Sequence, residues 1–473
     1  MIRKRSLILA AGVTAIICVI LGPAYGQSTF ASLLGTVRDP SGAVVSKSLV
    51  TVENKGTSAK RETATDASGD YSVTNLEPGA YLVTITAPGF QTFVRQVELT
   101  ARETVRLDGQ MSVAGQAQTV DVASEAPVVN TDVSNIAETK SGRELIDLPV
   151  AIATRASGST SPISTLTSQP GVQTDANGNI SVAGTKPTML SVSLDGISST
   201  GPRAASGTAG GPMSEMFPSF NTIAEIRVSE VNNAAEYGGV SDITTISKSG
   251  TNDIHGGAFE NLQNSDMNAR NLFSPIKPVV KLNDFGAYGG GKIWKDRTFW
   301  FASYEGLRLP KQTTIDQSVP SVALRSGDLS VYSTPIYQPG TNVAYPNNQI
   351  PLSQISSVSR NALTYLFPLP NTGAPNALAN NFVENIPTSI SSNQADLRLD
   401  QIISPKMQIF GRGTYKIRSV LAVPTGTPLV GPFSDPEIDY GYAIGFNWVI
   451  KSNLINEVRG GFNGNHTGIN IAA

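Results

Sequence analysis

The sequence predicts a mainly β protein, made of a small β-sandwich, a mixed α/β domain and the first strands of an antiparallel transmembrane β-barrel. Charged residues make up only 15% of the chain, against about 25% in ordinary globular proteins, while glycine, serine and threonine are plentiful. Short runs that alternate apolar and polar residues fill 31–111, and longer alternating runs with aromatic residues follow from about 251 onward. Both patterns are typical of strands and turns rather than helices.

Residues 1–26 are predicted to be a secretion signal. A basic start precedes the apolar run Leu7–Leu21, and the small residues near position 24 suit a signal peptidase, so we expect cleavage between Gly26 and Gln27. An uncleaved membrane anchor is the alternative, although a spanning helix needs about 20 apolar residues. The only cysteine, Cys18, lies in this segment, so the mature chain is expected to form no disulfide and no thiolate metal site.

Residues 29–111 are predicted to form the sandwich, because runs such as LVTVENK, YSVTNL and YLVTITA end at turn residues with sandwich-like spacing. The expected inward-facing residues are Val50, Val52, Tyr71, Val73, Val83, Ile85, Val97 and Leu99. The stretches GTVRDPSGAVV, TDASGDYSVTNLEPGAYLVTITAPGF and VELTARETVRLD resemble the carboxypeptidase regulatory-like domain, a transthyretin-like sandwich. This resemblance implies a carbohydrate-binding-like fold, with sugar binding as one role and a periplasmic spacer or docking module as the other.

Residues 112–132 read as an extended linker, since they hold small residues and a proline but too little apolar material for a core. Such a segment can pair with another sheet by strand addition.

Residues 133–250 contain sequence patterns of both helices and strands, so we expect a mixed α/β unit. SGRELIDLPV combines a serine cap with helical spacing and is expected to be a short helix stopped by Pro149, and SPISTLTSQPGV is a second short candidate. NISVAGTKPTMLSVSLDGI and SFNTIAEIRVSEV supply strand-like runs, and SDITTISKSG is expected to be the last strand of this unit.

Residues 251–473 are predicted to be barrel strands. In RTFWFASYEGL, Phe299, Phe301, Ser303 and Glu305 fall on one face and Trp300, Ala302, Tyr304 and Gly306 on the other. KMQIFGRGTYKI places polar residues on one face and mostly apolar residues on the other. A polar inner face and an apolar outer face are what a lipid-embedded strand requires. The polar segment Leu309–Thr388 suits an extracellular excursion.

The stretches SVAGTKPTMLSVSLDGI, NTIAEIRVSEVNNAAEYGGVSDITTISKSGTNDIHGGAFE and DFGAYGGGKIWKDRTFWFASYEGLR resemble the plug and first barrel strands of TonB-dependent outer-membrane receptors of the Oar-like type. The order of signal, sandwich, plug and barrel is also similar to that family. The chain departs from the family pattern at SDITTISKSG, where a second glycine-rich turn is more usual. The resemblance implies that residues 133–250 are the plug domain, and that QTVDVAS is a TonB box captured by a TonB-type energising protein in the periplasm.

This interpretation assigns residues to two local features. The candidate TonB box comprises Gln118, Thr119, Val120, Asp121, Val122, Ala123 and Ser124. The plug-to-barrel junction comprises Ser249, Gly250, Thr251, Asn252 and Asp253.

The barrel is expected to be incomplete, because plugged transporters use about 22 strands and 251–473 suffices for roughly eight to ten. We therefore expect an N-terminal portion of a larger receptor, or a truncated gene product.

Signals for catalysis and cofactors are weak. GAYGGGKI nearly matches a phosphate-binding loop, but Ile293 replaces the hydroxyl residue, and its glycines are expected at barrel turns. The two histidines, His255 and His466, have no second ligand at metal-site spacing, and the carboxylates of SLDGIS and DLRLD are expected to be solvated turn residues. We expect no enzyme activity, no cofactor, no metal and, at a net charge of −2, no nucleic-acid partner.

The leading hypothesis is a TonB-dependent receptor of the bacterial outer membrane that imports a substrate by plug rearrangement, with the sandwich and plug on the periplasmic side. Its partners would be the TonB-type protein, outer-membrane lipid and an unidentified extracellular substrate, with carbohydrate and peptide as candidates. The alternatives are an outer-membrane adhesion or assembly protein and a secreted carbohydrate-binding β protein.

Overall fold

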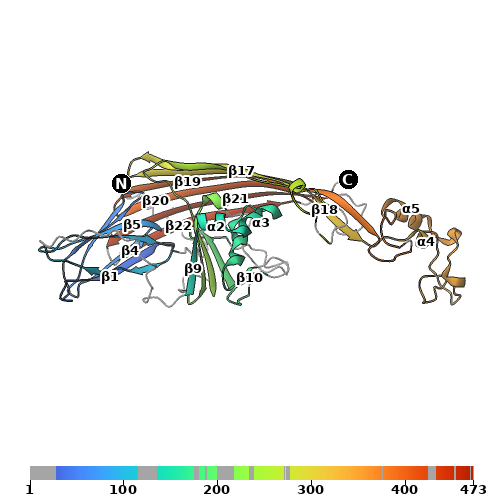
Figure 1. The fold of residues 1–473 in the computed structure, drawn as a ribbon, viewed down its shortest axis with the longest axis horizontal. Helices are drawn as coiled ribbons and strands as arrows, with labels where there is room; N and C mark the ends of the chain where they lie inside the picture. The colour runs from blue at the N-terminus through green and yellow to red at the C-terminus, as the bar shows by residue number, and fades with distance from the viewer. Residues whose placement is uncertain are drawn as a thin grey trace, which may run out of the picture.

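The computed structural model describes residues 28–114, 136–174, 180–186, 189–199, 218–233, 239–270, 272, 277–374, 376–423, 433–451, 454–468 and 470–471. Three β units follow one another along the chain, and we call them the sandwich (29–111), the plug (136–247) and the wall (255–467). In Figure 1 the long strands of the wall extend over the plug, and the sandwich lies at one end of them. The predicted signal and TonB box lie outside the described residues.

The sandwich consists of two small sheets, with strand orders β4-β1-β7, where β8 also pairs with β1, and β3-β2-β5-β6. Its strands are β1 (Ala31–Arg38), β2 (Leu49–Asn54), β3 (Lys60–Ala64), β4 (Asp70–Leu76), β5 (Gly79–Thr86), β6 (Phe93–Leu99), β7 (Thr104–Arg106) and β8 (Gly109–Gln110). The predicted inward-facing residues form its core, except that Val97 is only partly buried against it.

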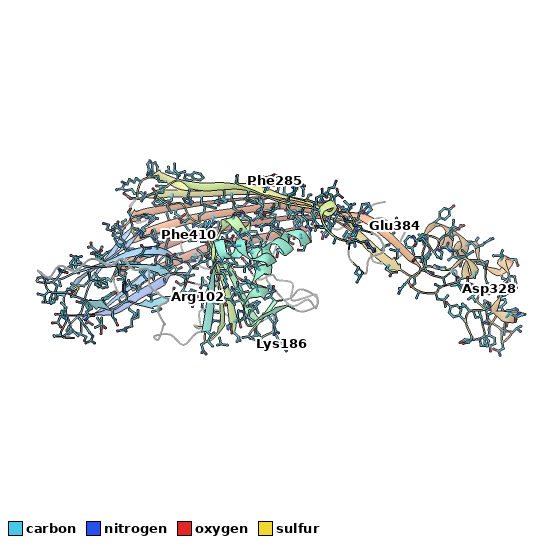
Figure 2. All side chains as sticks on the ribbon, viewed as in Figure 1. Arg102, Lys186, Phe285, Asp328, Glu384 and Phe410 are labelled. Atoms are coloured by element: carbon cyan, nitrogen blue, oxygen red, sulfur yellow. The ribbon has the colours of Figure 1, made fainter. Side chains whose placement is uncertain are left out.

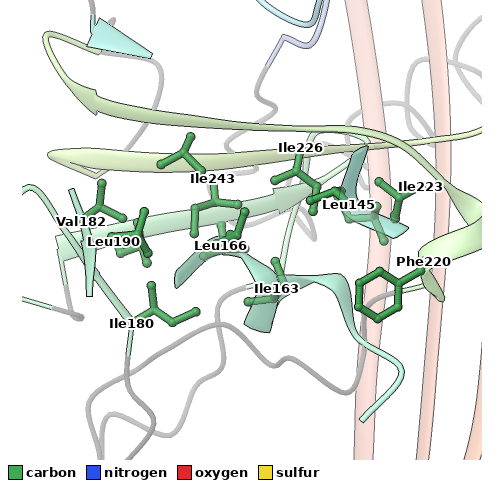
Figure 3. Packing of buried hydrophobic residues seen from close by; sticks show 14 of the residues in the cluster. Leu145, Ile163, Leu166, Ile180, Val182, Leu190, Phe220, Ile223, Ile226 and Ile243 are labelled. Carbon is green, nitrogen blue, oxygen red and sulfur yellow. The ribbon is translucent and has the colours of Figure 1, made fainter. Parts of the chain in front are cut away.

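The plug is a five-stranded sheet with helices packed on it. Its sheet has the order β13-β12-β15-β14-β9, and a separate pair is formed by β10 and β11. The elements are β9 (Ile136–Ser141), α2 (Gly142–Asp147), α3 (Pro149–Ser157), η1 (Pro162–Ser168), β10 (Val172–Thr174), β11 (Ile180–Val182), β12 (Leu190–Leu194), β13 (Ile197–Ser198), η5 (Phe220–Thr222), β14 (Ile223–Val231) and β15 (Ser241–Ser247). Figure 3 shows Leu145, Ile163 and Leu166 packed with strand residues in one apolar core.

Local sequence explains how the first plug helix begins and ends. The Ser141 hydroxyl accepts a hydrogen bond from the Glu144 N–H at 3.3 Å, and the Glu144 carboxylate accepts one from the Ser141 N–H at 2.7 Å. This capping box satisfies backbone donors that the first helical turn leaves unpaired. The helix ends at Asp147 before Pro149, as predicted, but Pro149 then begins α3, which the prediction missed. Proline is tolerated there because the first helical residue needs no N–H partner.

The wall belongs to one antiparallel sheet with the order β16-β17-β18-β19-β20-β21-β22, and β23 also pairs with β21. The strands are β16 (His255–Asn264), β17 (Lys281–Trp294), β18 (Thr298–Gln317), β19 (Phe382–Ser404), β20 (Met407–Ala422), β21 (Phe433–Lys451), β22 (Leu454–Thr467) and β23 (Asn470–Ile471). Between its strands lie η6 (Ser265–Met267), α4 (Val322–Arg325), η7 (Pro346–Asn348), η8 (Leu352–Gln354) and α5 (Ser357–Tyr365). Within the described residues the sheet is open, with β16 and β22 at its edges.

Short and long connections alternate along the wall. The segments 295–297 and 405–406 are short turns, whereas the connection between β18 and β19, residues 318–381, is much longer. Short turns at one end and long loops at the other are typical of outer-membrane barrels, where the short turns face the periplasm. The sandwich lies at the end with the short turns, and the long excursion that contains Asp328 extends from the opposite end (Figure 2).

The glycine-rich stretch GAYGGGKI lies inside β17 rather than at a turn, which corrects the prediction. A side chain at Gly286 would collide with the ring of Phe259, and one at Gly290 would press on the ring of Phe301. These glycines leave room for neighbouring aromatic rings on the wall.

Candidate functional site: the plug and wall interface

The strands β19 and β20 present polar side chains to the plug and apolar side chains outward. On β19 the buried residues include Gln394, Asp396, Arg398 and Asp400, while Leu397 and Leu399 are exposed. On β20 the buried residues include Arg412, Thr414 and Lys416, while Tyr415 and Ile417 are exposed. The predicted alternation is confirmed in β20, and in β18 for Phe299, Phe301, Ser303 and Glu305, which are buried while the residues between them are more exposed. The outward apolar face suits contact with lipid, and the plug covers the polar face.

A tight turn of the plug carries Asp195 into the wall. Asp195 and Gly196 follow β12 with φ angles of 51° and 76°, a left-handed geometry that reverses the chain into β13. The Asp195 carboxylate accepts hydrogen bonds of 2.9 Å from both the N–H and the hydroxyl of Ser247. These bonds fix the carboxylate to the end of β15, so its position depends on the plug sheet.

Asp195 forms buried ion pairs with two strands of the wall. Its Oδ2 lies 2.7 Å from Nε of Arg412, and its Oδ1 lies 3.3 Å from Nη1 of Arg398. Arg398 also donates to Asp400, with Nη2 2.9 Å from Oδ1. Burial by itself raises the pKa of Asp195, but Arg398 and Arg412 outweigh it and hold the pKa below its ordinary value. Two carboxylates, Asp195 and Asp400, therefore face the two guanidinium groups of Arg398 and Arg412.

A second buried cluster joins helix α3 to β17 and β18. Nε of Arg155 lies 2.7 Å from Oδ2 of Asp284, and the Arg155 guanidinium stacks 4.5 Å from the ring centre of Phe220. Asn261 of β16 donates to the same Asp284 oxygen at 2.9 Å. Glu305, only 2% exposed, lies on the neighbouring strand opposite Gly286. One guanidinium of the plug thus faces two carboxyl groups of the wall.

A hydrogen-bonded network lies between the two ionic clusters. The hydroxyls of Thr222 in the plug and Ser303 in the wall are 2.7 Å apart, and each also lies near Oδ2 of Asp396. The hydroxyl of Thr414 donates to the other oxygen of Asp396 at 2.7 Å. These side-chain contacts between plug and wall are polar, and each can be exchanged for water at modest net cost.

The sandwich also touches the plug at a buried carboxyl group. The N–H of Ala101 donates to Oε1 of Glu225 at 2.5 Å. Burial raises the pKa of Glu225 to about 7, with the Ala101 N–H and Arg227 opposing the shift and Glu103 and Glu98 adding to it.

The raised pKa of Glu225 predicts a pH-dependent stability. Because the folded pKa exceeds the unfolded value, this contribution is fully present below about pH 4.5 and is lost as the pH rises through 7. A shift of this size corresponds to about 3 kcal/mol. Glu225→Gln retains an acceptor for Ala101 without the charge, so its melting temperature should exceed the parent's at pH 8 and match it near pH 4. The exposed Glu62→Gln is the control, and equal melting curves for Glu225→Gln and the parent at pH 8 would contradict the prediction.

Sequence reasoning misplaced the acidic residues of this interface. It expected the carboxylates of SLDGIS and DLRLD to be solvated, but Asp195, Asp396 and Asp400 are 2%, 6% and 9% exposed. They are buried because the plug covers the inner face of β19. The alternation of Asp396, Arg398 and Asp400 with Leu397 and Leu399 was the available signal. No sequence pattern marked Arg155 as a residue of this interface.

The predicted junction residues Ser249–Asp253 lie between β15 and β16, the last plug strand and the first wall strand. His255 begins β16, and its Nδ1 lies 3.1 Å from the backbone carbonyl oxygen of Asp253. Among the described residues, His, Cys, Asp and Glu side chains do not gather in threes or more around a place for a metal ion. In the same part of the chain, no helix has the length and apolar character needed to cross a bilayer.

Comparison with known proteins identifies two domains of this chain and a homologue. A model of the outer membrane beta barrel domain matches residues 246–472, and a model of the carboxypeptidase regulatory-like domain matches residues 32–112. The TonB-dependent transporter Oar of Myxococcus xanthus is 28% identical over 318 residues, which cover 61% of this chain. The chain is a homologue of Oar. The shared region covers 28% of the length of Oar, and the barrel domain places this Oar homologue in the bacterial outer membrane.

Solved receptor structures are similar to the Oar homologue over part of its length. The siderophore receptor PirA of Acinetobacter baumannii aligns with 70% of this chain and 40% of its own, at 14% identity and a TM-score of 0.42. The ferric enterobactin receptor PfeA of Pseudomonas aeruginosa aligns with 71% of this chain and 42% of its own, at 11% identity and a TM-score of 0.43.

Proposed function

We propose that this Oar homologue is a TonB-dependent receptor that imports an extracellular substrate when the plug rearranges against the wall. The observation that supports this most directly is that plug and wall have separate apolar cores. The plug cluster contains only residues between Leu145 and Ile243, and the main wall cluster contains Leu282, Leu307, Leu309 and Ile390. The plug can therefore move as a rigid unit without exposing an apolar core shared with the wall.

The contacts that would have to break are polar and balanced. Buried ion pairs contribute little net stability, because desolvation offsets much of their attraction, but they fix geometry and they reform when water is excluded again. Two sets of ion pairs therefore hold the plug reversibly against the wall. They are the pairs of Asp195 with Arg398 and Arg412 and the pair of Arg155 with Asp284. A pull on the chain before β9 acts first on the pairing of this edge strand with β14, so these contacts would break only when the plug moves as a unit.

The linker supplies the point of attachment in this proposal. Residues 118–124 (QTVDVAS) are the candidate TonB box, and they precede the plug in the sequence by a short stretch of chain. An extended β-branched segment of this kind suits capture by strand addition, in which main-chain hydrogen bonds supply the affinity.

Deleting residues 118–124 is expected to abolish retention of the solubilised protein on an immobilised TonB periplasmic domain. Deleting the equally long segment 125–131 is the matched control and should leave retention intact. Circular dichroism verifies that both variants keep their β structure. If the deletion of 118–124 leaves retention unchanged, the box assignment is wrong, and an outer-membrane adhesion or assembly protein becomes the better description.

A further inference from the structure

A single turn of the sandwich docks into the plug. The turn between β6 and β7 places Arg102 at φ 60°, and its guanidinium forms a buried ion pair with Asp242 of β15. The same guanidinium lies 3.0 Å from the hydroxyl of Thr244, and the preceding Ala101 is 0% exposed. Figure 2 shows Arg102 where the sandwich meets the plug.

The sandwich also binds the wall at the end that carries the short turns. Thr29 accepts a hydrogen bond of 2.7 Å from Arg459 of β22, and Glu77 accepts one of 3.1 Å from Gln408 of β20. Asn75 is hydrogen-bonded to Asn447 of β21. The sandwich thus touches three successive wall strands close to the periplasmic end.

A third contact joins the sandwich to the junction between plug and wall. The N–H of Asn252 donates to the carbonyl oxygen of Gly56 at 2.8 Å, and its side-chain amide lies 3.3 Å from the hydroxyl of Ser58. Residues of the sandwich, plug and wall together line an open pocket of about 380 Å³. Phe30 and Glu77 of the sandwich line it opposite Arg398 and Phe410 of the wall. This volume is within the range of small-molecule sites.

We propose that the sandwich is a second gate, which closes the periplasmic exit beside the plug and must undock before cargo leaves. The apolar core of the sandwich contains only its own residues, from Ala31 to Met111, so undocking leaves it intact. The contacts of the sandwich to plug and wall described above are polar, and the Arg102–Asp242 ion pair is the most deeply buried of them. The purpose of the gate rests on the proposed transport function, but the docking can be tested without transport.

The docking test uses one cysteine in the full-length protein, since the only natural cysteine lies in the predicted signal. Ala101→Cys should react with a bulky maleimide at least tenfold more slowly than the exposed Ala67→Cys. Adding Arg102→Glu should bring the two rates together, and adding Asp242→Arg to that variant should restore slow labelling by reversing the charges. Fast labelling of Ala101→Cys in the parent background, or slow labelling despite Arg102→Glu, would overturn the docking.

The gating test compares labelling of Ala101→Cys in energised cells with and without TonB. We expect at least a tenfold faster reaction when TonB is present, and no such gain when Ser58→Cys and Asn252→Cys join sandwich to junction by a disulfide. An equal rate with and without TonB, in a protein that is retained on the TonB domain, would overturn the gate while leaving the proposed function intact. If the parent protein is not retained on the immobilised TonB domain, the proposed function is wrong. The labelling rates of the Arg102→Glu and Asp242→Arg variants would then still test whether the sandwich docks onto the plug.

Discussion

An engineered disulfide between Thr222→Cys of the plug and Ser303→Cys of the wall is expected to abolish TonB-driven movement of the plug. The two hydroxyl oxygens are 2.7 Å apart, so sulfur atoms in their place need only a small shift to reach the S–S bond length of about 2.0 Å. The bond would replace an exchangeable hydrogen bond by a covalent link between η5 and β18. Because the only natural cysteine lies in the predicted signal, no competing thiol is expected in the mature chain.

Movement can be followed through Thr160→Cys, a plug residue that is 1% exposed and whose hydroxyl lies 3.3 Å from Nζ of Lys416 in the wall. Energised cells should label this cysteine readily in the parent background and at the level of TonB-free cells in the cross-linked variant. Reductant should restore labelling. The variant with Ser303→Cys but not Thr222→Cys is the control, since it cannot form the bond. If labelling persists in the fully cross-linked protein, the plug does not move against β18 during the cycle.

Replacing Asp195 by asparagine is expected to weaken the plug by about 3–5 kcal/mol, the usual cost of removing one partner from a buried ion pair. Arg412 would lose the carboxylate at 2.7 Å, and Arg398 would keep only Asp400. The uncompensated guanidinium groups would remain buried, which is the source of the cost. Urea titration of the purified protein, followed through the reactivity of Thr160→Cys, measures this change.

The control for Asp195→Asn is Asp253→Asn, a carboxylate at the exposed junction. Its removal should change the free energy of plug opening by less than about 0.5 kcal/mol, as is usual for surface substitutions. The lowered pKa of Asp195 also predicts how this stabilisation depends on pH. It is present above the ordinary pKa of an aspartate and is lost as the pH falls through the pKa of the folded state. A midpoint for Asp195→Asn equal to that of the parent would show that Arg398 and Arg412 do not hold the plug.

The two ionic clusters differ in composition. In the first, Asp195 and Asp400 pair with Arg398 and Arg412. In the second, Arg155 of the plug pairs with Asp284, and the buried Glu305 lies on the neighbouring strand of the wall.

Part of this structure was predictable because its causes are local. Alternation along a strand follows from backbone geometry, so Phe299, Phe301, Ser303 and Glu305 could be assigned to one face before any partner was known. The same is true of the sandwich core and of the capping box at Ser141. The start of α3 at Pro149 was missed, because proline both ends one helix and suits the first turn of another.

The strand partners in the plug could not be predicted from adjacent sequence. β12 follows β11 in the sequence, but its partner is β15, with which it pairs in parallel from Leu190 opposite Ser241 to Leu194 opposite Thr245. Parallel partners need a long crossover, so their identity is a property of the whole unit. The docking of Arg102 onto Asp242 was invisible for the same reason.

The sequence by itself determined the mainly β character of this protein, the faces of its strands and its resemblance to TonB-dependent receptors, because periodicity and turn residues act over a few positions. Only the tertiary structure decided which charges are buried and paired. Asp195 and Arg398 are 203 positions apart, and their contact exists only because the turn after β12 lies against the inner face of β19. The energy of a charge depends on its solvent exposure and on its partner, and neither is a property of a single stretch of chain.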